Sequence, residues 1–426
     1  MISIFEYDPA RSDEILSREN NRAGEVSAVV ADIIATVRRD GDAALKAFAE
    51  KFDRVTLDSL EVTEAEMQAA LSAVPAKFLE VAKKSAQNIE AFHRRQVRDG
   101  FRFEPQDGVV LGQKVTPLAK VGLYIPGGTA PLSSSVLMNA IPAKIAGVPN
   151  IVLATPPAKD GGVSPYILAA AHVAGVTRIF KMGGAQAIAA LAYGTESVPA
   201  VDKIVGPGNA FVAEAKRQVF GTVDIDMIAG PSEILIVADG GCDPTNVAAD
   251  LLSQAEHDRL ASAVLVTPDR ALAGAVQQEL EVQIPLLPRA DIARTSIDNR
   301  GKIIIVDSID QAIDVANALA PEHLELCVED ALDRLDSVKN AGSIFLGRYC
   351  PEALGDYFAG PNHVLPTGGT ARFSSPLSVD DFVKRSAFTY YTADALRAVN
   401  EDVAYFAETE ELHAHARSAT VRFEKD

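Results

Sequence analysis

From about residue 119 onward, short runs rich in Val and Ile alternate with longer stretches of helical hydrophobic spacing, and this alternation is what most constrains the fold. Parallel strands need a crossover of a dozen or more residues between them, and the usual crossover is a helix. The sequence therefore predicts an α/β fold with parallel sheets. The expected strands are Lys120–Tyr124, Ile151–Thr155, Arg178–Met182, Lys203–Val205, Ile234–Ala238, Ala263–Thr267, Lys302–Asp307 and Ser343–Leu346.

The first hundred residues have a helical pattern instead. Apolar residues recur at i, i+3 and i+4 between residues 24 and 52, and Gly41 divides this stretch into two expected helices. The run Thr63-Glu64-Ala65-Glu66 predicts a capping box for a third helix. Pro75 predicts the start of a fourth helix, and His93 is expected at its solvated end.

Two further segments have patterns of their own. Asp107-Gly108 lies between two apolar runs and predicts a β-hairpin. Residues 393–403 and 406–418 predict helices with few bulky apolar positions. A helical tail that cannot bury its own face usually packs on the rest of its chain or on a partner subunit.

Length and charge narrow the class of protein. A chain of 426 residues predicts at least two domains. Its net charge of -18 argues against sequence-independent binding to nucleic acid or an anionic membrane, and no apolar run is long enough to cross a bilayer. With only three cysteines and no expected secretory signal, a cytoplasmic protein is predicted.

Three glycine-rich turns each follow an expected strand and lead into a helix: Pro126–Thr129, Gly183–Gln186 and Gly206–Asn209. Backbone amides at such a helix start suit the pyrophosphate of a dinucleotide. All three lack the spacing G-x-G-x-x-G, and the left-handed backbone of a tight turn requires glycine even where no ligand binds. A nucleotide site is one of two interpretations of these turns.

Polar side chains occur where a buried helix face is expected. If residues 250–258 form a helix, Gln254 and His257 share its inward face. The pair is either a hydrogen-bonded core pair or part of a metal or substrate site. Asp250 and Ser253, on the same face, either support such a site from outside or only pack in the helix. His172, in an apolar helix, is expected to be a core or interface residue.

Acid and imidazole groups recur in the last hundred residues. Glu322 and His323 are adjacent in an expected loop, where both can converge on one substrate. Asp356 lies in a glycine-rich loop, and Glu411 and His415 are i, i+4 neighbours on the tail helix. Gln254, His257, Asp356 and one tail histidine would suit zinc, although ordinary surface loops and a solvated helix end would contain the same residue types.

A cysteine nucleophile is the competing chemistry. Enzymes that oxidise aldehydes often use a thiolate, and Cys327 lies four residues after His323. The surrounding run Leu324–Val328 predicts a buried strand, in which a small buried residue is the commoner meaning. We therefore rank Cys327 below the carboxylate and imidazole groups.

Taken together, long motifs along nearly the whole chain resemble the histidinol dehydrogenase family. The motifs are residues 121–128 (VGLYIPGG), 183–189 (GGAQAIA), 203–209 (KIVGPGN), 229–233 (AGPSE), 250–257, 320–324 (APEHL) and 360–366 (GPNHVLP). The resemblance implies a zinc- and NAD-dependent enzyme that oxidises L-histidinol through L-histidinaldehyde to L-histidine.

The resemblance also implies a domain organisation: two related, incomplete Rossmann-like domains, with small N- and C-terminal helical segments exchanged in a homodimer. The expected division is an N-terminal segment at 1–22, a main domain at 23–123 with 233–377, an inserted NAD-binding domain at 124–232, and a swapped tail at 378–426.

Individual residues acquire roles by the same resemblance. Glu322 matches the base that activates water, and His323 matches the proton shuttle. The implied zinc ligands are Gln254, His257 and Asp356, with His415 from the other subunit. The implied substrate contacts are Ser232, Gln254, His257, His323, Asp356, Glu410 and His415, and His363 is a further candidate. The implied NAD contacts are Tyr124, Gln186 and Asn209.

Two alternatives remain at the level of sequence. One is another zinc-dependent alcohol or amino-alcohol dehydrogenase of the same fold, which would differ in pocket residues away from the metal. The other is a non-catalytic binding protein for small metabolites. The adjacent Glu322 and His323 offer a binder little benefit, so the sequence favours an enzyme.

Overall fold

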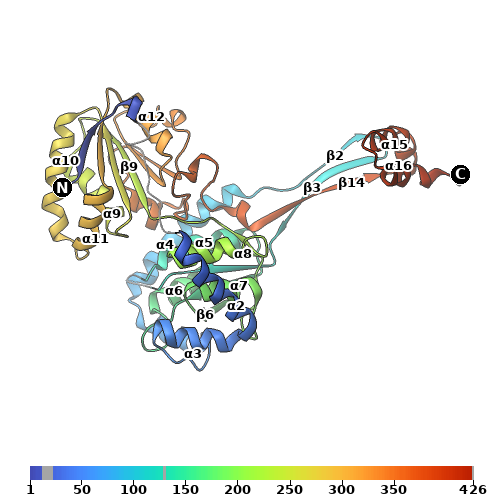
Figure 1. Ribbon diagram of the computed structural model, residues 1–426, viewed down its shortest axis with the longest axis horizontal. Coiled ribbons are helices and arrows are strands. Elements are labelled where there is room, and N and C mark those ends of the chain that lie inside the picture. Colours follow the sequence, from blue (N-terminus) through green and yellow to red (C-terminus); the bar gives the residue numbers. More distant parts are fainter. Residues whose placement is uncertain (12–22, 128–130, 425–426) are drawn as a thin grey trace. The chain divides into compact units, whose positions relative to one another are not determined.

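A computed structural model describes residues 1–11, 23–127 and 131–424, which form two compact units (Figure 1). The first unit comprises Met1–Gln96 and Leu118–Phe382, and the second comprises Val97–Pro117 and Val383–Asp426. The second half of the first glycine-rich turn, from Gly128 to Thr129, and most of the N-terminal segment, residues 12–22, lie outside the described residues.

The first unit contains a five-stranded parallel sheet in the order β6-β5-β4-β7-β8. Its strands are β4 (Lys120–Tyr124), β5 (Asn150–Thr155), β6 (Arg178–Lys181), β7 (Lys203–Val205) and β8 (Asp224–Ile225). The crossover helices are α5 (Ser133–Ile145), α6 (Pro165–Ala174), α7 (Gly184–Tyr193) and α8 (Ala210–Val219). Chain order reverses at β4, so the carboxyl ends of β4 and β7 flank a switch point, where ligands bind in such sheets.

A second, six-stranded parallel sheet of the same unit repeats this plan in the order β1-β11-β10-β9-β12-β13. Its strands are β1 (Ser3–Glu6), β9 (Glu233–Ala238), β10 (Ser262–Thr267), β11 (Lys302–Ile305), β12 (His323–Cys327) and β13 (Ser343–Leu346). Its helices are α9 (Pro244–Ala255), α10 (Arg270–Gln283), α11 (Ala290–Arg300) and α12 (Ile309–Leu319). Figure 1 shows α9, α10 and α11 beside β9. Strands β9 to β13 follow the same winding as the five-stranded sheet, which confirms two related Rossmann-like folds.

The expectation of a helical N-terminal segment is wrong for residues 3–6. They form β1, which pairs in parallel with β11 of the same chain, Ser3 opposite Lys302. Ile2, directly before the strand, is buried in the core that α9 and α10 make with the six-stranded sheet. The burial of Ile2 and the hydrogen bonds between β1 and β11 therefore favour a strand in a segment that was expected to be helical.

The N-terminal helices begin close to the predicted residues. They are α2 (Ala23–Phe48), α3 (Glu64–Ala73) and α4 (Ala76–His93). Gly41 interrupts α2 with φ 54°, and Thr63 and Glu66 form the expected capping box on α3. Their apolar faces pack with α5 to α8, so they accompany the five-stranded sheet. The division implied by the resemblance groups residues 23–123 with residues 233–377 instead, and this division stays a prediction.

His93 corrects a prediction. It was expected at a solvated helix end, but it is fully buried. Its Nδ1 donates to Gln96 Oε1 at 2.7 Å, and Asn362 Nδ2 donates to its Nε2 at 3.4 Å. Asn362, from a distant loop, therefore covers the end of α4. His172 is exposed on α6, so the core alternative for this residue is wrong, and the interface alternative stays a prediction.

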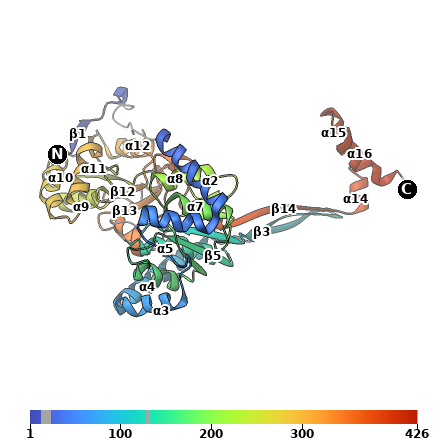
Figure 2. The ribbon, with the colours of Figure 1, turned by 60° about the horizontal axis from the view of Figure 1, so that its bottom comes forward.

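The second unit is an antiparallel sheet followed by short helices. The predicted hairpin is confirmed as β2 (Phe101–Gln106) and β3 (Val109–Pro117), and β14 (Val383–Tyr391) pairs with β3 along its whole length. Figure 2 shows β3 and β14 side by side, with α14 (Ala393–Arg397), α15 (Asn400–Thr409) and α16 (His413–Thr420) after β14. None of the described helices in either unit is both long and apolar enough to cross a membrane.

Candidate active site

Glu322 and His323 lie at the amino end of β12, between β9 and β13 in the six-stranded sheet. Glu322 Oε2 accepts from the backbone N–H of Glu233 at 2.8 Å, and His323 Nδ1 donates to the Glu233 carbonyl oxygen at 2.9 Å. His323 was expected in a loop, but it is the first residue of a buried strand, opposite Ile234. The backbone that follows Ser232 therefore holds both catalytic candidates in fixed positions.

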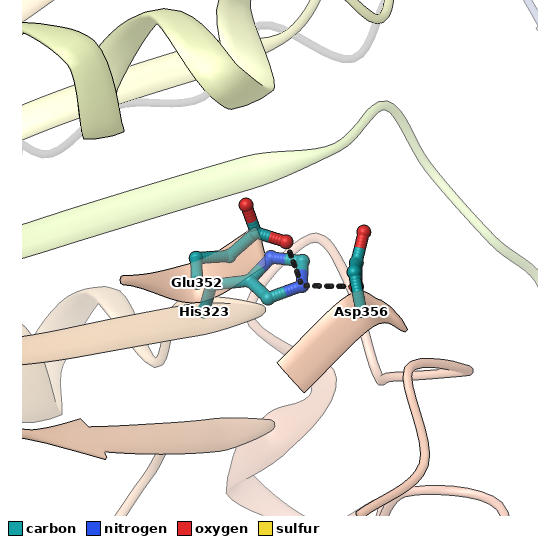
Figure 3. Close-up of side chains that lie close together, drawn as sticks. All are labelled: His323, Glu352 and Asp356. Carbon is teal, nitrogen blue, oxygen red and sulfur yellow. Dashed lines mark ion pairs between the residues drawn. The ribbon is translucent and has the colours of Figure 1, made fainter. Parts of the chain in front are cut away.

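Two carboxylates face the other nitrogen of this imidazole (Figure 3). His323 Nε2 lies 3.7 Å from Glu352 Oε1 and 3.8 Å from Asp356 Oδ1. Glu352 begins α13 (Glu352–Leu354), and Asp356 follows in a π-helical turn. Ligand atoms of His323, Glu352 and Asp356 all lie within 4.8 Å of one another, close enough to hold one metal ion. Sequence reasoning missed Glu352, although its i, i+4 spacing from Asp356 was a usable signal.

The charges of this cluster shift its pKa values strongly. Burial raises the pKa of Glu322 to about 8. Burial alone would lower the pKa of His323, but the carboxylates of Glu322, Asp356 and Glu352 outweigh it and raise the pKa to about 10. Burial and the Asp356 charge raise the pKa of Glu352 to about 7. Burial opposes ionisation of Asp356 too, yet His323 and His363 hold its pKa well below the usual range. Such opposed shifts in one cluster are typical of functional sites.

The helix that carries Gln254 ends sooner than predicted. Gln254 is in the last turn of α9, is 1% exposed, and neither polar atom of its side chain has a hydrogen-bond partner within the described part of the chain. His257 lies beyond the helix end and is exposed, so its expected inward position on the helix is wrong. Burial lowers the pKa of the His257 imidazole, and the charge of Asp356 opposes this shift.

The donor atoms fit a bound cation. Buried polar groups normally have partners. Here His323 Nε2, Glu352 Oε1 and both polar atoms of Gln254 are buried without one among the described residues. Imidazole, carboxylate and amide donors suit zinc or a similar divalent ion. Ser253, left undecided by the sequence, donates to Glu352 Oε2 at 2.9 Å and orients that carboxylate from outside.

His363 connects this cluster to the other sheet. Its Nδ1 donates to the backbone carbonyl of Asp356 at 3.1 Å, and Ser135 Oγ donates to its Nε2 at 3.1 Å. Ser135 is in the first turn of α5, which begins at the carboxyl edge of the five-stranded sheet. The acid and imidazole groups of one sheet therefore lie near the ligand-binding edge of the other.

The three residues matched to NAD lie together at that edge. Tyr124 ends β4, Gln186 is in the first turn of α7, and Asn209 caps α8 by accepting from the backbone of Phe211 and Val212. The Tyr124 hydroxyl accepts from Gly184 N at 3.0 Å, and burial raises its pKa to about 12. The Tyr124 side chain therefore stays neutral and holds the glycine-rich turn at Gly183–Gln186 beside the end of β4.

Cys327 lacks the environment of a nucleophile. Cys242 and Cys327 are buried, and Cys242 Sγ donates to the Cys327 carbonyl at 2.8 Å. That sulfur contact, burial and the charge of Glu325 raise the pKa of Cys327 far above its usual range. Burial also raises the pKa of nearby Asp250 to about 6. The thiol is therefore held in its unreactive form, as the sequence ranking anticipated.

The remaining predicted residues are divided between the units. Ser232 precedes β9 and is half-buried near Glu322. Glu410 and His415 belong to the second unit, where Glu410 follows α15 and His415 is in the first turn of α16. The first unit by itself thus assembles Gln254, Glu322, His323, Glu352 and Asp356, without the two tail residues.

The chain is similar to one family over nearly its full length. A family model described as histidinol dehydrogenase matches residues 16–423. The histidinol dehydrogenase of Clostridium acetobutylicum is 55% identical over 95% of this chain and 94% of its own. That of Geobacillus kaustophilus is 57% identical over 93% of both chains. A crystal structure of histidinol dehydrogenase from Elizabethkingia anophelis superposes with a TM-score of 0.95 at 38% identity, covering 100% of this chain and 98% of the other.

Proposed function

Because the chain belongs to the histidinol dehydrogenase family, we propose that the cluster around His323 is where it oxidises L-histidinol. The reaction of the family is the NAD-dependent oxidation of L-histidinol through L-histidinaldehyde to L-histidine, which completes histidine biosynthesis. The observation that carries the site assignment is the buried Nε2 of His323, which faces two carboxylates while Glu322 lies beside the same ring.

His323 is the proton acceptor of the first oxidation in this proposal. Its Nδ1–H is bound to the Glu233 carbonyl, so Nε2 is the nitrogen that can take the hydroxyl proton of the alcohol when the ring is neutral. A bound cation beside Asp356 and Glu352 would offset the carboxylate charges that raise the pKa of His323, and would so favour the neutral ring. The carbon must then lose a hydride, and the oxygen becomes the aldehyde oxygen. A ring that is fixed by the backbone at one nitrogen presents the other without reorganisation.

Glu322 is the proton acceptor of the second oxidation. Deprotonation of a water by its carboxylate lets the oxygen add to the aldehyde carbon, and the resulting hydrate can lose a second hydride to give L-histidine. The buried position of Glu322 raises its proton affinity, which suits a group that must gain and release a proton near neutral pH. A buried cluster also keeps the aldehyde from bulk water.

Bound zinc would supply fixed positive charge for orienting the amine and imidazole of the substrate, and bound NAD would supply the hydride acceptor. For zinc we propose Gln254, His257 and Asp356, with His415 of the partner subunit as the fourth ligand. For NAD we propose Tyr124, Gln186 and Asn209. The orphaned amide of Gln254 and the place of Asp356 in the cluster of metal-ligating groups support the zinc set.

Substrate contacts and assembly complete the proposal. We propose contacts from Ser232, His323, Asp356, Glu410 and His415, and a homodimer with shared active sites. Half-buried Ser232 is close to the catalytic pair, which supports its role. The acidic composition and the three unpaired cysteines support a cytoplasmic location for the dimer.

Metal removal tests the function directly. We expect the enzyme to reduce NAD with L-histidinol, to lose this activity after treatment with a chelator, and to regain it with added zinc, because the buried carboxylates need a cation to hold substrate. The measurement is NADH absorbance, with metal content checked by elemental analysis. Unchanged turnover in protein verified to be metal-free would reject the zinc assignment.

A further inference from the structure

We propose that Lys216 and Asp226 are positioning residues for the dinucleotide: their buried ion pair holds the Gly206 peptide at the carboxyl edge of the five-stranded sheet. This inference rests on the proposed function, because it takes Tyr124 and Asn209 as contacts of NAD.

The ion pair encloses a single glycine. The side chains of Lys216, on α8, and Asp226, after β8, are 2% and 1% exposed, and they contact each other directly. Lys216 Nζ also donates to the Gly206 carbonyl oxygen at 3.0 Å. Asp226 Oδ2 accepts from Gly206 N at 2.7 Å, and its Oδ1 accepts from Met227 N at 2.6 Å. Both backbone polar groups of Gly206 are therefore bound by this one pair.

Gly206 lies between two residues proposed to contact NAD, so a small shift of its peptide would move both contacts. It directly follows β7, and its φ of 118° is one that only glycine adopts readily. A Cβ at this position would lie 2.0 Å from the Tyr124 carbonyl oxygen, so the Gly206 backbone touches the end of β4. Asn209 follows three residues later as the cap of α8. The pair thus sets the spacing between two of the proposed NAD contacts, at the switch point of the sheet.

Stability alone is a weak reason for such a pair. Removing two charges from water is costly, and well-packed apolar residues often replace a buried ion pair with little loss of stability. Apolar residues could not bind the N–H and the carbonyl of Gly206 at once. Holding this peptide in one position is therefore the function that requires both charged side chains.

Three variants separate positioning from stability: Lys216→Met, Asp226→Asn, and the double variant Lys216→Met with Asp226→Leu. For each, KM for NAD, KM for L-histidinol, kcat and the melting temperature are measured, and NAD binding is measured by calorimetry. We expect KM for NAD to rise about tenfold in all three, since misplaced contacts weaken binding. KM for L-histidinol should stay within about twofold. The double variant should regain melting temperature lost in the single variants without regaining affinity for NAD.

Lys203→Met is the matched control. Lys203 is 7% exposed by side chain and is paired with Asp224 at 3.0 Å and Asp381 at 3.3 Å, but it lies at the amino end of the same strand β7. This variant should lower the melting temperature and leave KM for NAD unchanged.

Two results would overturn the inference: an unchanged KM for NAD in the folded variants, or a KM that recovers together with stability in the double variant. If Lys216→Met does not fold, Asp226→Asn and the double variant still test whether the ion pair positions the NAD contacts. Failure of the unmodified enzyme to reduce NAD with L-histidinol would instead reject the proposed function.

Discussion

At the scale of single residues, long-range backbone contacts fix the positions of the two catalytic candidates, while burial and neighbouring charges shift their pKa values. Glu322 and His323 are adjacent in sequence, yet both are held by the backbone of Glu233, about ninety positions away. One carbonyl selects the tautomer of His323, and one N–H fixes the Glu322 carboxylate. The two groups thereby acquire separate roles, one toward the alcohol and one toward the aldehyde.

Replacing Glu322 should slow the second oxidation much more than the first. In Glu322→Gln we expect oxidation of L-histidinaldehyde to slow by at least about 100-fold, because no general base remains for the attacking water. The yield of NADH per L-histidinol should fall from two toward one. Stopped-flow absorbance with each substrate measures both quantities. Exposed Glu329→Gln is the control from the same segment, and equal slowing of both oxidations would contradict the assigned role.

Buried His93 should make the fold sensitive to acid. Burial lowers the pKa of His93, against its bond to Gln96, so the folded protein keeps the ring neutral. Its contribution to stability is therefore complete above the unfolded pKa of about 6.5 and is lost as pH falls below it. Between pH 7 and pH 5.5 the free energy of unfolding should fall less in His93→Gln than in the unmodified protein. The difference should be at most about 1.4 kcal/mol per pH unit.

Urea unfolding at both pH values measures this difference. Exposed His172→Gln should keep the pH dependence of the unmodified protein. If His93→Gln keeps the same pH dependence as well, the ring does not titrate in this window and the assignment is wrong.

At the scale of elements, the residues that cap a helix locally also make contacts with residues distant in sequence. The capping box of α3 pairs Thr63 with the Glu66 backbone, while Glu66 Oε2 returns to Thr63 N at 2.7 Å. The other oxygen of Glu66 binds buried Lys181 at 2.9 Å, at the end of β6. The start of α3 is therefore tied to the strand that leads into the second glycine turn.

Loss of this cap should have a measurable cost. We expect Thr63→Ala to lower the free energy of unfolding by about 1 kcal/mol, because the backbone N–H of Glu66 loses its acceptor. Chemical denaturation measures the change, with exposed Thr56→Ala as the control. A variant as stable as the unmodified protein would show that the box adds nothing to the fold.

At the scale of the whole molecule, the proposed zinc site draws on two units of the chain. Gln254, His257 and Asp356 belong to the first unit, and His415 belongs to the second. In the proposed homodimer, His415 comes from the partner subunit. Each active site would then require both subunits, which is a property that mixing experiments can detect.

Mixed dimers test shared sites. His257→Ala and His415→Ala should each be inactive, and a mixture that has exchanged subunits should regain activity, because a mixed dimer holds one site with both ligands intact. NADH production after refolding the two variants together measures the recovery. No recovery despite exchange verified by differently tagged chains would mean that each subunit builds its own site.

The sequence by itself determined most helices, the parallel strands between residues 120 and 346, the caps and the family, because each depends on neighbouring residues or on long motifs. It did not reveal β1 or β14, which lie in segments expected to be helical. Gly41, the Thr63 box and the Val- and Ile-rich strands needed no distant partner to be recognised. Only the tertiary structure decided that the catalytic pair begins a strand, that Glu352 joins it, and that His93 is buried. Those facts depend on Glu233, on the turn from Glu352 to Asp356, and on Asn362, whose distances in sequence leave no periodic signal.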